Sequence, residues 1–527
     1  MRLLKKYSHD ASIFEIQPRL VVFPKDSDDL SKLVRFISSH KTKDNQLSLT
    51  ARSGGTDMSG GAINDSIIVS FGKYFKRLEP VESRSITAEP GVYYRQFEKR
   101  TLLSNLLMPA YPASKNICMI GGMLANDAGG EKSLAYGKVH DYVTRLKVVL
   151  SDGAEYLFQP LTIEDLSQKL KQTDFEGEIY RQIYKLIRGH QHLLKVSKPR
   201  VNKNSTGYNL WDVWDGKTFD LTKVFVGSQG TLGLITEASF RLVPTKAASG
   251  MLIMYLEDLK SLAAIINEVL GTNPTSFEAF DEHTVRFALR FFPYFRKSLG
   301  WWGLIKLAVR LLPELRLLLK GLPKLILLVE YELDDQAQIE AKLDQLKQRL
   351  SRFDVRLEEA KNQTAQSKFW LLRRESFNIL RHNVKDRHAA PFIDDLVVPP
   401  RNLPEFLPQL QRILDKYKLL YTIAGHMGDG NFHIIPLMRL EHQVERVKLE
   451  PVMREVNDLV VRYHGSLSGE HNDGLIRGPF LEQMYDAKIL TMFKRVKEIF
   501  DPLDIFNPHK KITADWDFSK QHIRWRY

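Results

Sequence analysis

Two clusters of glycines constrain this chain more than any other feature of its sequence. Residues 54–61 contain four glycines and residues 121–137 contain five, and apolar runs such as 66–70 and 145–150 lie beside them. Glycine has no Cβ and readily adopts positive φ, so a loop rich in glycine can bring its backbone close to a ligand. The pattern therefore predicts two ligand-binding loops between strands.

The first cluster has the composition of an anion-binding loop. Four short hydroxyl or carboxyl side chains accompany the glycines between Arg52 and Gly61. Backbone N–H groups in such a turn can converge on a pyrophosphate. The segment matches neither the G-x-x-x-x-G-K-[ST] loop nor a G-x-G-x-x-G turn that opens a helix, which disfavours nucleotide hydrolysis and Rossmann-type NAD binding. Taken alone, it could equally be an ordinary turn.

The second cluster strengthens the ligand-binding interpretation. Pro112 to Gly130 contains two glycine pairs with Asn126 between them, and Tyr136 to Asp141 follows. These small residues form a surface that backbone can press against a flat ring. The two loops together could bracket a dinucleotide.

These segments, with G-S-Q-G-T-L-G-L-I-T at 227–236, resemble the vanillyl-alcohol-oxidase flavoprotein superfamily. The glycine loop, the P-x-S turn, the I-G-G-x-x-A-x-x-A-G-G segment and the G-S-x-G-T-L-G-x-I-T strand occur in the family's order, and the resemblance spans roughly residues 15–512. It implies an α+β fold with a PCMH-type FAD-binding domain and an antiparallel-sheet substrate domain of the FAD-linked oxidase C-terminal type. The implied FAD-binding residues are Arg52, Ser53, Gly54, Gly55, Thr56, Asp57, Ser59, Gly60, Pro112, Ser114, Gly121, Gly122, Asn126, Gly129, Gly130, Ile235 and Asn507.

Two details of the first loop bear on how FAD is held. Asp57 stands where many relatives carry glycine, so its carboxylate must turn outward or be hydrogen-bonded, because a buried unpaired charge is costly. Covalently flavinylated branches of the family use a His or Cys at defined loop positions, and residues 52–61 contain neither. We therefore expect non-covalent FAD.

Along the chain, strand and helix patterns predict two domains. We expect the FAD-binding domain at 1–246, a substrate domain at 247–505 and a C-terminal segment at 506–527 that returns to the FAD domain. Within the second domain, strands at 251–256 and 325–332 alternate with helical periods at 259–270, 337–353 and 403–417, an α+β pattern.

Composition narrows the classes further. A chain of 527 residues with a single cysteine, Cys118, can form neither an intramolecular disulfide framework nor a protein-ligated iron–sulfur cluster. The N-terminus lacks the apolar core of a secretory signal, so a cytoplasmic location is expected. The formal net charge of +13 favours anionic partners, but no nucleic-acid-binding motif is evident.

One stretch, 290–322, departs from the globular pattern. It combines Phe, Trp and Leu with seven basic residues and one acidic residue, Glu314. Its charges and Pro313 exclude a membrane span, whereas the composition suits an amphipathic helix in the membrane interface. The alternative is a core or subunit-interface helix pair whose basic side faces solvent.

A second constellation lies toward the C-terminus. His426 and His433 are seven residues apart, an odd spacing that sends side chains to opposite faces of a straight strand, but Gly428 and Gly430 allow a bend that brings both imidazoles to one point. Two histidines and a carboxylate are a recurrent ligand set for Zn²⁺ or a related divalent ion. Such a pair is also compatible with two purely structural histidines.

The order G-H-x-G-D-G-N-x-H and then G-E-H resembles the D-lactate and D-2-hydroxyglutarate dehydrogenase branch of the superfamily. That resemblance implies His426, His433 and Glu470 as metal ligands and His471 as the catalytic base. A W-x-x-R segment implies Arg373 as the clamp for the substrate carboxylate, with the neighbouring Arg374 as a solvated surface charge. Residues 391–399 lack the Lys that some relatives use for a distal carboxylate, which puts a dicarboxylate substrate in doubt.

The leading hypothesis is an FAD- and metal-dependent dehydrogenase of D-2-hydroxy acids that passes electrons to a quinone or an electron-transferring flavoprotein. In this hypothesis, contact through 290–322 would hold the protein on the inner face of the membrane. One alternative is a flavin enzyme acting on a sugar or aldonolactone without the metal. Another is a membrane-surface binding protein that uses the flavin fold as a scaffold.

Overall fold

The computed structural model describes residues 2–282, 323–360, 362, 364–367, 369–370 and 387–525. The chain divides into two compact units, the first formed by Met1–Thr245 and Ser466–Trp525 and the second by Lys246–Gly465. The first boundary falls beside the expected residue 246. The chain returns to the first unit at Ser466, about 40 residues before the expected 506.

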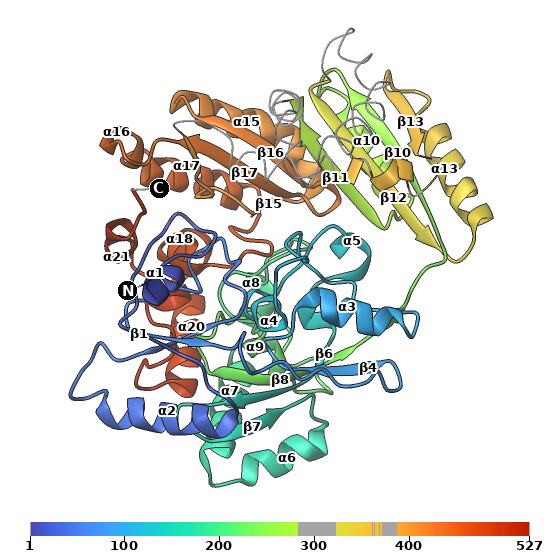
Figure 1. Cartoon of the computed structure of the whole chain (residues 1–527). Coiled ribbons are helices and arrows are strands. Elements are labelled where there is room, and N and C mark those ends of the chain that lie inside the picture. Colours follow the sequence, from blue (N-terminus) through green and yellow to red (C-terminus); the bar gives the residue numbers. More distant parts are fainter. Residues whose placement is uncertain are drawn as a thin grey trace. The chain divides into compact units, whose positions relative to one another are not determined.

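The first unit contains two main sheets (Figure 1). In a parallel sheet of order β1-β3-β2, the central strand pairs with both neighbours, and a four-stranded antiparallel sheet has the order β4-β8-β6-β7. The strands are β1 (Leu20–Val22), β2 (Leu49–Arg52), β3 (Ile67–Ser70), β4 (Ser85–Ala88), β5 (Leu106–Leu107), β6 (Val143–Val149), β7 (Glu155–Phe158), β8 (Leu234–Arg241) and β9 (Val243–Pro244). Strands β5 and β9 form a separate pair.

Helices cover these sheets. They are α1 (Arg2–Tyr7), α2 (Ser27–His40), α3 (Tyr94–Leu102), α4 (Ile120–Asn126), α5 (Ser133–Tyr136), α6 (Ile163–Lys171), α7 (Phe175–Gly189), α8 (Gln191–Ser197), α9 (Thr222–Phe225), α18 (Gly474–Arg477), α19 (Leu481–Met484), α20 (Ala487–Phe500) and α21 (Trp516–Gln521), with 3₁₀ turns η1 (Val139–Asp141), η5 (Gly478–Phe480) and η6 (Lys511–Thr513).

Helix α2 shows how sequence fixes position. The Asp26 side chain caps it by accepting a hydrogen bond from the backbone N–H of Asp29. Leu30, Val34 and Ile37 lie on one face of the helix and are buried against the β1-β3-β2 sheet. Helix α2 thereby supports the sheet whose strand β2 leads into the first glycine loop.

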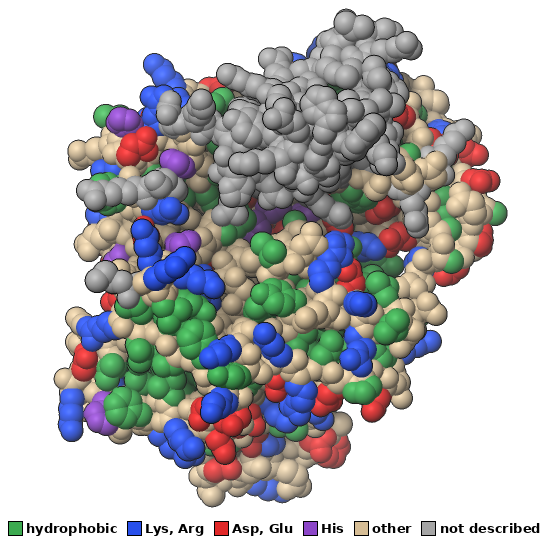
Figure 2. Space-filling view, in the orientation of Figure 1, with side chains coloured by type: hydrophobic (Ala, Val, Ile, Leu, Met, Phe, Trp, Pro, Cys, Tyr) green, Lys and Arg blue, Asp and Glu red, His purple; other side chains and the backbone are tan. Residues whose placement is uncertain are grey.

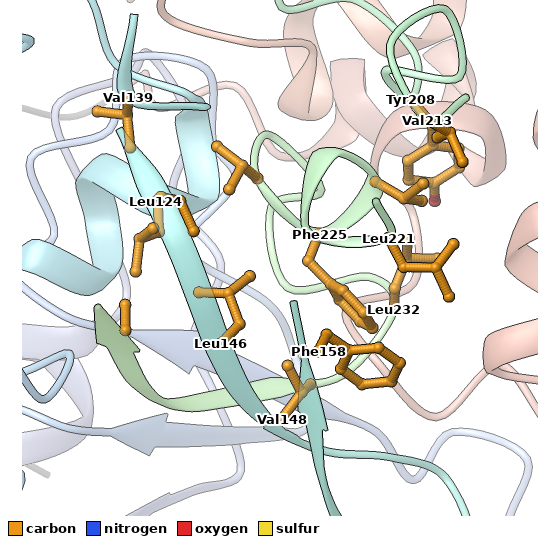
Figure 3. Packing of buried hydrophobic residues seen from close by; sticks show 14 of the residues in the cluster. Leu124, Val139, Leu146, Val148, Phe158, Tyr208, Val213, Leu221, Phe225 and Leu232 are labelled. Carbon is orange, nitrogen blue, oxygen red and sulfur yellow. The ribbon is translucent and has the colours of Figure 1, made fainter. Parts of the chain in front are cut away.

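The larger core of the first unit lies on the four-stranded sheet. Figure 3 shows Leu146 and Val148 of β6 pointing toward the same apolar space as Phe158 and Phe225. The Phe158 and Phe225 rings are 4.7 Å apart between centroids, and Phe225 contacts Phe500 of α20 at 5.0 Å. A helix from the last part of the chain therefore completes a core that the first part begins.

The second unit is one antiparallel sheet with helices packed on it. Its order is β13-β10-β12-β11-β16-β17-β14, and β15 also pairs with β17. The strands are β10 (Ala248–Leu256), β11 (Ser276–Asp281), β12 (Leu325–Leu333), β13 (Arg356–Ala360), β14 (His388–Ala389), β15 (Leu396–Val397), β16 (Leu420–His426) and β17 (Asn431–Met438). The described helices are α10 (Leu262–Leu270), α13 (Gln336–Leu350), α15 (Leu403–Lys416), α16 (Gln443–Arg446) and α17 (Leu449–Arg462), with 3₁₀ turns η3 (Pro400–Asn402) and η4 (Met427–Asp429).

The expected α+β fold, with an antiparallel second sheet, is confirmed. Strands β10 and β12 and helices α10, α13 and α15 coincide with the periodic segments of the sequence. Helix α13 packs so closely on β10 that a Cβ on Gly250 would lie 2.3 Å from Ile339. Among the helices that the structure describes, none is long and apolar enough to cross a bilayer.

Candidate functional site

A pocket in the first unit lies among the predicted glycine segments. It is lined by the loop after β2, by Pro90, by α4 and by the segment before β8. The predicted residues on its wall are Ser53, Gly54, Gly55, Thr56, Asp57, Gly121, Gly122, Asn126 and Ile235. The remaining lining residues are Ala51, Gly61, Ala62, Phe71, Ala125, Gln229, Gly230 and Gly233. The two glycine clusters and the 227–236 motif therefore meet at one cavity.

Close packing explains several of these glycines. A Cβ on Gly121 would lie 2.4 Å from the Ser53 hydroxyl, and one on Gly130 would lie 2.1 Å from the Tyr111 carbonyl oxygen. At Gly122 a Cβ would meet no atom within 4 Å. Since Gly122 lies on the pocket wall, its open side is space that a flat ligand can use at contact distance.

Asp57 organises the first loop. Its Oδ2 accepts hydrogen bonds from the backbone N–H groups of Ser59 at 2.9 Å and Gly61 at 2.6 Å, and its Oδ1 accepts one from Asn126 Nδ2 at 2.7 Å. The carboxylate is therefore hydrogen-bonded, one of the two arrangements that the sequence analysis allowed. These bonds also tie the first glycine cluster to the second.

Arg52 is predicted to bind FAD, and in the structure its guanidinium holds the N-terminal segment. It donates to the carbonyl oxygens of Tyr7, His9 and Ala62. Its cation also lies 5.2 Å from the centroid of the Tyr7 ring. Arg52 therefore fixes residues 7–9 against the loop.

A buried charge cluster lies behind the loop. Burial and the nearby Asp57 carboxylate raise the pKa of Asp10, so this acid retains its proton more readily than usual. Burial lowers the pKa of Lys510 to about 7, and Asp10 opposes that shift. An acid that is partly neutral repels a pyrophosphate less than an ionised one.

The other predicted FAD residues support the loops in different ways. Asn507 donates from Nδ2 to the carbonyl oxygens of Gly61 and Gln229, at 2.8 and 2.7 Å. Gly60 has φ +84°, and its Cα faces Phe14 and Leu475. Ser59 accepts from Gln229 Nε2, while Pro112 and Ser114 accept backbone hydrogen bonds in the turn that ends at Cys118.

Glu470 lies beside the second glycine cluster, within the first unit. Its carboxylate is buried, and its Oε2 is 3.0 Å from Lys203 Nζ, which also donates to the Gly130 carbonyl oxygen at 3.3 Å. A Cβ on Gly129 would lie 2.9 Å from the same Oε2. The predicted base His471 follows, with 21% of its side chain exposed.

Two further buried lysines surround this turn. Lys138 Nζ lies 2.8 Å from Asp127, whose carboxylate also binds His140 Nδ1 at 2.8 Å. Lys511 Nζ lies 2.8 Å from Asp473. Burial lowers the pKa of Lys511, and the Asp473 carboxylate offsets only part of that shift. A network of buried ion pairs therefore underlies the G-E-H turn.

The second unit brings the two predicted histidines together. Strands β16 and β17 form a hairpin through η4 and Gly430, which has φ +67°. Ala424 pairs with His433, so His426, two residues after Ala424, lies on the same face of the sheet. The imidazole centroids are 5.3 Å apart and the rings are nearly perpendicular, at 86°. The bend that the sequence predicts is this hairpin.

Both histidines contact buried carboxylates that the sequence analysis missed. His426 Nδ1 lies 2.6 Å from Glu278 Oε1, and His433 Nδ1 lies 3.1 Å from Asp394 Oδ1. Asn431 Nδ2 donates to the neighbouring Asp395 at 3.0 Å. The sequence contains a signal for these two carboxylates. Glu278 stands among apolar residues in a strand, and Asp394 is one of two adjacent aspartates in an otherwise apolar segment. Arg373, Arg374 and the segment 290–322 lie outside the described residues.

Family models match both parts of the chain. The model of the C-terminal domain of FAD linked oxidases matches residues 247–511, just over half of the chain. The chain belongs to the FAD-linked oxidases. A model of the FAD binding domain matches residues 18–156, which include both glycine clusters up to Gly137. Most of the residues that line the glycine-lined pocket lie within this FAD-binding domain, which supports the predicted cofactor FAD.

This FAD-linked oxidase resembles curated enzymes along nearly all of its length. It is 27% identical over 514 residues to a D-2-hydroxyglutarate dehydrogenase of Pseudomonas putida, covering 96% of this chain and 49% of that protein. A glycolate oxidase subunit GlcD of Bacillus subtilis is 25% identical, with 97% of this chain and 92% of that protein covered. The chain spans about half the length of the Pseudomonas putida enzyme and of the D-2-hydroxyglutarate dehydrogenases of Pantoea ananatis and Escherichia coli.

Solved structures support the same fold. A 4-ethylphenol oxidase from Gulosibacter chungangensis superposes with a TM-score of 0.67 at 15% identity, covering 98% of this chain and 94% of that one. A p-cresol methylhydroxylase superposes with a TM-score of 0.65 at 14% identity, covering 98% and 93%. At such identities the likeness concerns the fold alone, and it confirms the expected PCMH-type architecture.

On the face seen in Figure 2, Lys and Arg side chains are mixed with acidic and hydrophobic ones over the described part of the first unit. On this face, the basic side chains are therefore not gathered into a single patch. Their distribution gives no reason to favour one anionic partner over another.

Proposed function

We propose that this chain is an FAD-dependent dehydrogenase that oxidises a D-2-hydroxy acid of the D-lactate or D-2-hydroxyglutarate class to the 2-oxo acid. The observation that supports it most is the paired-histidine hairpin, each imidazole in contact with a buried carboxylate, in a chain that also has the glycine-lined pocket of an FAD-binding domain. The similar D-2-hydroxyglutarate dehydrogenase and glycolate oxidase subunit are both named for 2-hydroxy acids.

The glycine-lined pocket fits FAD on local grounds. Close backbone packing at Gly121 and open space at Gly122 provide a surface that a flat ring can approach. Bound FAD, which we propose is non-covalent, supplies the acceptor for the hydride from the substrate α-carbon. Asp57, Asn126 and Asn507 keep the two loops in register around it.

The chain's own groups supply the rest of the chemistry. We propose that His471 takes the hydroxyl proton, a role for which neutral imidazole is suited near pH 7. Arg373 would bind the substrate carboxylate in a bidentate manner. His426 and His433 fit a divalent cation such as Zn²⁺, with Glu470 as the third proposed ligand, and such an ion would supply positive charge to the substrate oxygens. Loss of one proton and one hydride yields the 2-oxo acid.

The two electrons must leave the reduced cofactor. We propose a quinone or an electron-transferring flavoprotein as the acceptor. With a quinone, segment 290–322 would hold the enzyme on the inner face of the membrane, where each Lys or Arg near an anionic leaflet adds about 1 kcal/mol. Co-sedimentation with anionic liposomes, measured for the protein with and without residues 291–321, tests the proposed membrane contact separately from the activity.

Anaerobic reduction of the flavin tests the activity. The oxidised flavin spectrum should bleach with D-lactate or D-2-hydroxyglutarate and not with the L enantiomers. Bleaching by an aldonolactone or a sugar, with no response to any hydroxy acid, would contradict the proposal and favour the sugar-oxidising alternative. A metal-stripped sample, run in parallel, distinguishes the two classes further, because only the hydroxy-acid reaction is expected to need the ion.

A further inference from the structure

Two buried carboxylates contact the histidines of the hairpin through the same ring atom. In each pair the Nδ1 atom faces the carboxylate, at 2.6 Å for His426 with Glu278 and 3.1 Å for His433 with Asp394. The side chains of Glu278 and Asp394 are 1% and 0% exposed. Two histidines from different strands thus have the same contact, a buried carboxylate at Nδ1.

The sheet explains why the four groups meet. Strands β11 and β16 are antiparallel, and Ala279 pairs with Gly425. The next residues along the two strands, Glu278 and His426, therefore lie opposite each other. On the other side, β15 pairs with β17 at Leu396 and Phe432, which brings the end of the 391–395 segment beside His433. Each histidine therefore has a carboxylate from a different neighbouring segment.

A carboxylate at Nδ1 determines the tautomer of a neutral imidazole. The Nδ1 proton is donated to the carboxylate, and Nε2 becomes the nitrogen that carries the lone pair. Histidines that bind metals commonly have their other ring N–H bound in this way by a carboxylate, which orients the ring and makes the ligand nitrogen more basic. His426 and His433 are both expected to be Nδ1–H tautomers, and their ring centroids are 5.3 Å apart.

Charge balance favours the same interpretation. Burying carboxylates is less costly when positive charge lies nearby. A divalent ion on the two Nε2 atoms would place such charge one imidazole ring away from each carboxylate. Imidazole nitrogens favour Zn²⁺ and the later first-row ions over Mg²⁺ or Ca²⁺.

We propose that Glu278 and Asp394 are positioning residues that hold His426 and His433 as Nδ1–H tautomers, so that both Nε2 atoms are set to bind one divalent cation. This inference rests on the metal site of the proposed function and adds the two residues that would prepare it. It concerns the second unit alone.

Zinc titration of the metal-stripped, FAD-containing protein tests the inference. A fluorescent zinc chelator competes for Zn²⁺ with the wild type, Glu278→Gln and Asp394→Asn, which are isosteric and remove one charge each. We expect each variant to bind Zn²⁺ about 10–100-fold more weakly, the usual effect of losing such a partner. The matched control is Glu330→Gln, a buried glutamate of β12 in the same sheet whose carboxylate accepts from Ser276 and Trp370. It should bind Zn²⁺ as the wild type does.

The tautomers offer a second readout that does not depend on metal. In ¹⁵N-histidine-labelled, metal-free protein, two imidazoles that disappear in His426→Ala and His433→Ala should carry their proton on Nδ1. Glu278→Gln should change that pattern at His426 only. Glu278→Asp, which retracts the carboxylate by one methylene, replaces Glu278→Gln if the latter is not recovered folded, and it too should weaken zinc binding.

Two outcomes would overturn the inference. One is zinc binding by Glu278→Gln and Asp394→Asn as tight as that of the wild type, and the other is a wild type that binds no zinc. Flavin reduction by D-2-hydroxy acids, measured on the same samples, separates this result from the proposed function. If hydroxy acids reduce the wild-type flavin but the protein binds no zinc, the proposed dehydrogenase activity stands and the inference is wrong. If the variants bind zinc more weakly but no hydroxy acid reduces the flavin, the inference stands and the proposed activity is wrong.

Discussion

Lys203 and Glu470 form an ion pair inside the first unit, with 3.0 Å between Nζ and Oε2 and side chains that are 1% and 5% exposed. They are 267 residues apart in the chain. The pair joins the segment between α8 and α9 to the G-E-H turn beside Gly129 and Gly130. Such a pair makes each partner depend on the other, because removing the opposite charge from beside a buried charge is costly.

The first prediction follows from that dependence. Lys203→Met should destabilise the protein by about 3–5 kcal/mol, because it removes the lysine charge that is paired with the buried Glu470 carboxylate. Glu470→Gln in the same chain should recover part of the loss. Lys198→Met is the control, since its pair with Asp212 is half exposed and should be worth no more than about 1 kcal/mol. Denaturant midpoints measure all four proteins, and equal midpoints for Lys203→Met and Lys198→Met would contradict the prediction.

A second prediction concerns the open side of Gly122. A leucine there favours the helix more than glycine does and meets no protein atom at its Cβ, so Gly122→Leu should fold. Its side chain should fill the pocket, and the purified protein should lose most of its flavin. Gly189→Leu is the matched control, because a Cβ at Gly189 also meets nothing within 4 Å but this glycine lies at the exposed end of α7. The flavin absorbance per polypeptide measures this loss. A Gly122→Leu protein with the full wild-type flavin content would show that the cofactor binds elsewhere.

The third prediction is a pH dependence at His140. Burial lowers the pKa of this imidazole, but the Asp127 carboxylate outweighs burial, so the folded pKa lies above the usual histidine value of about 6.5. Stability from the charged pair is therefore fully present below about pH 6.5 and is lost as the pH rises through the folded pKa. His140→Gln should cost about 1.5–3 kcal/mol at pH 6 and progressively less at alkaline pH. Thermal unfolding of both proteins across this range measures the difference, with the exposed His192→Gln as control, and a difference independent of pH would argue against a charged His140.

The fourth prediction addresses the proposed base. His471→Ala should keep its flavin and its metal, yet its flavin should be reduced by substrate ~10²–10⁴-fold more slowly, the usual effect of a missing general base. Stopped-flow absorbance under anaerobic conditions measures that rate. His442→Ala, a change at an exposed histidine, should behave as the wild type. Reduction of His471→Ala at the wild-type rate would remove this residue from the mechanism.

Local patterns in the sequence predicted those parts of the fold and the site that depend on neighbours along the chain. The helical periods at 337–353 and 403–417 predicted α13 and α15, and the glycine clusters predicted the loops of the pocket. Gly428 and Gly430 between His426 and His433 indicated a bend that could bring the two imidazoles together, because the hairpin that joins them is itself local.

Contacts between distant segments could not be predicted in this way. Glu278 precedes His426 by 148 residues, and only the pairing of β11 with β16 brings them together. Arg52 could not be assigned to the carbonyl oxygens of residues 7–9 without knowing that the N-terminal segment lies on the loop. The return to the first unit at Ser466 was also missed, because its sequence resembles a turn with metal ligands rather than a domain boundary.

The discontinuity of the first unit has a consequence for how this protein is made. Strand β2 receives its last partner when Leu49 pairs with Ile505 and Asn507, and Asn507 then closes the loop at Gly61. During synthesis, the nucleotide pocket cannot be completed until more than 440 residues after Gly61 have left the ribosome. The Lys246–Gly465 unit leaves the ribosome before these last partners, and all the described strands of its sheet lie within that range. Contacts of such high sequence separation form slowly, so a nascent chain would expose the unfinished pocket until the last part of its translation.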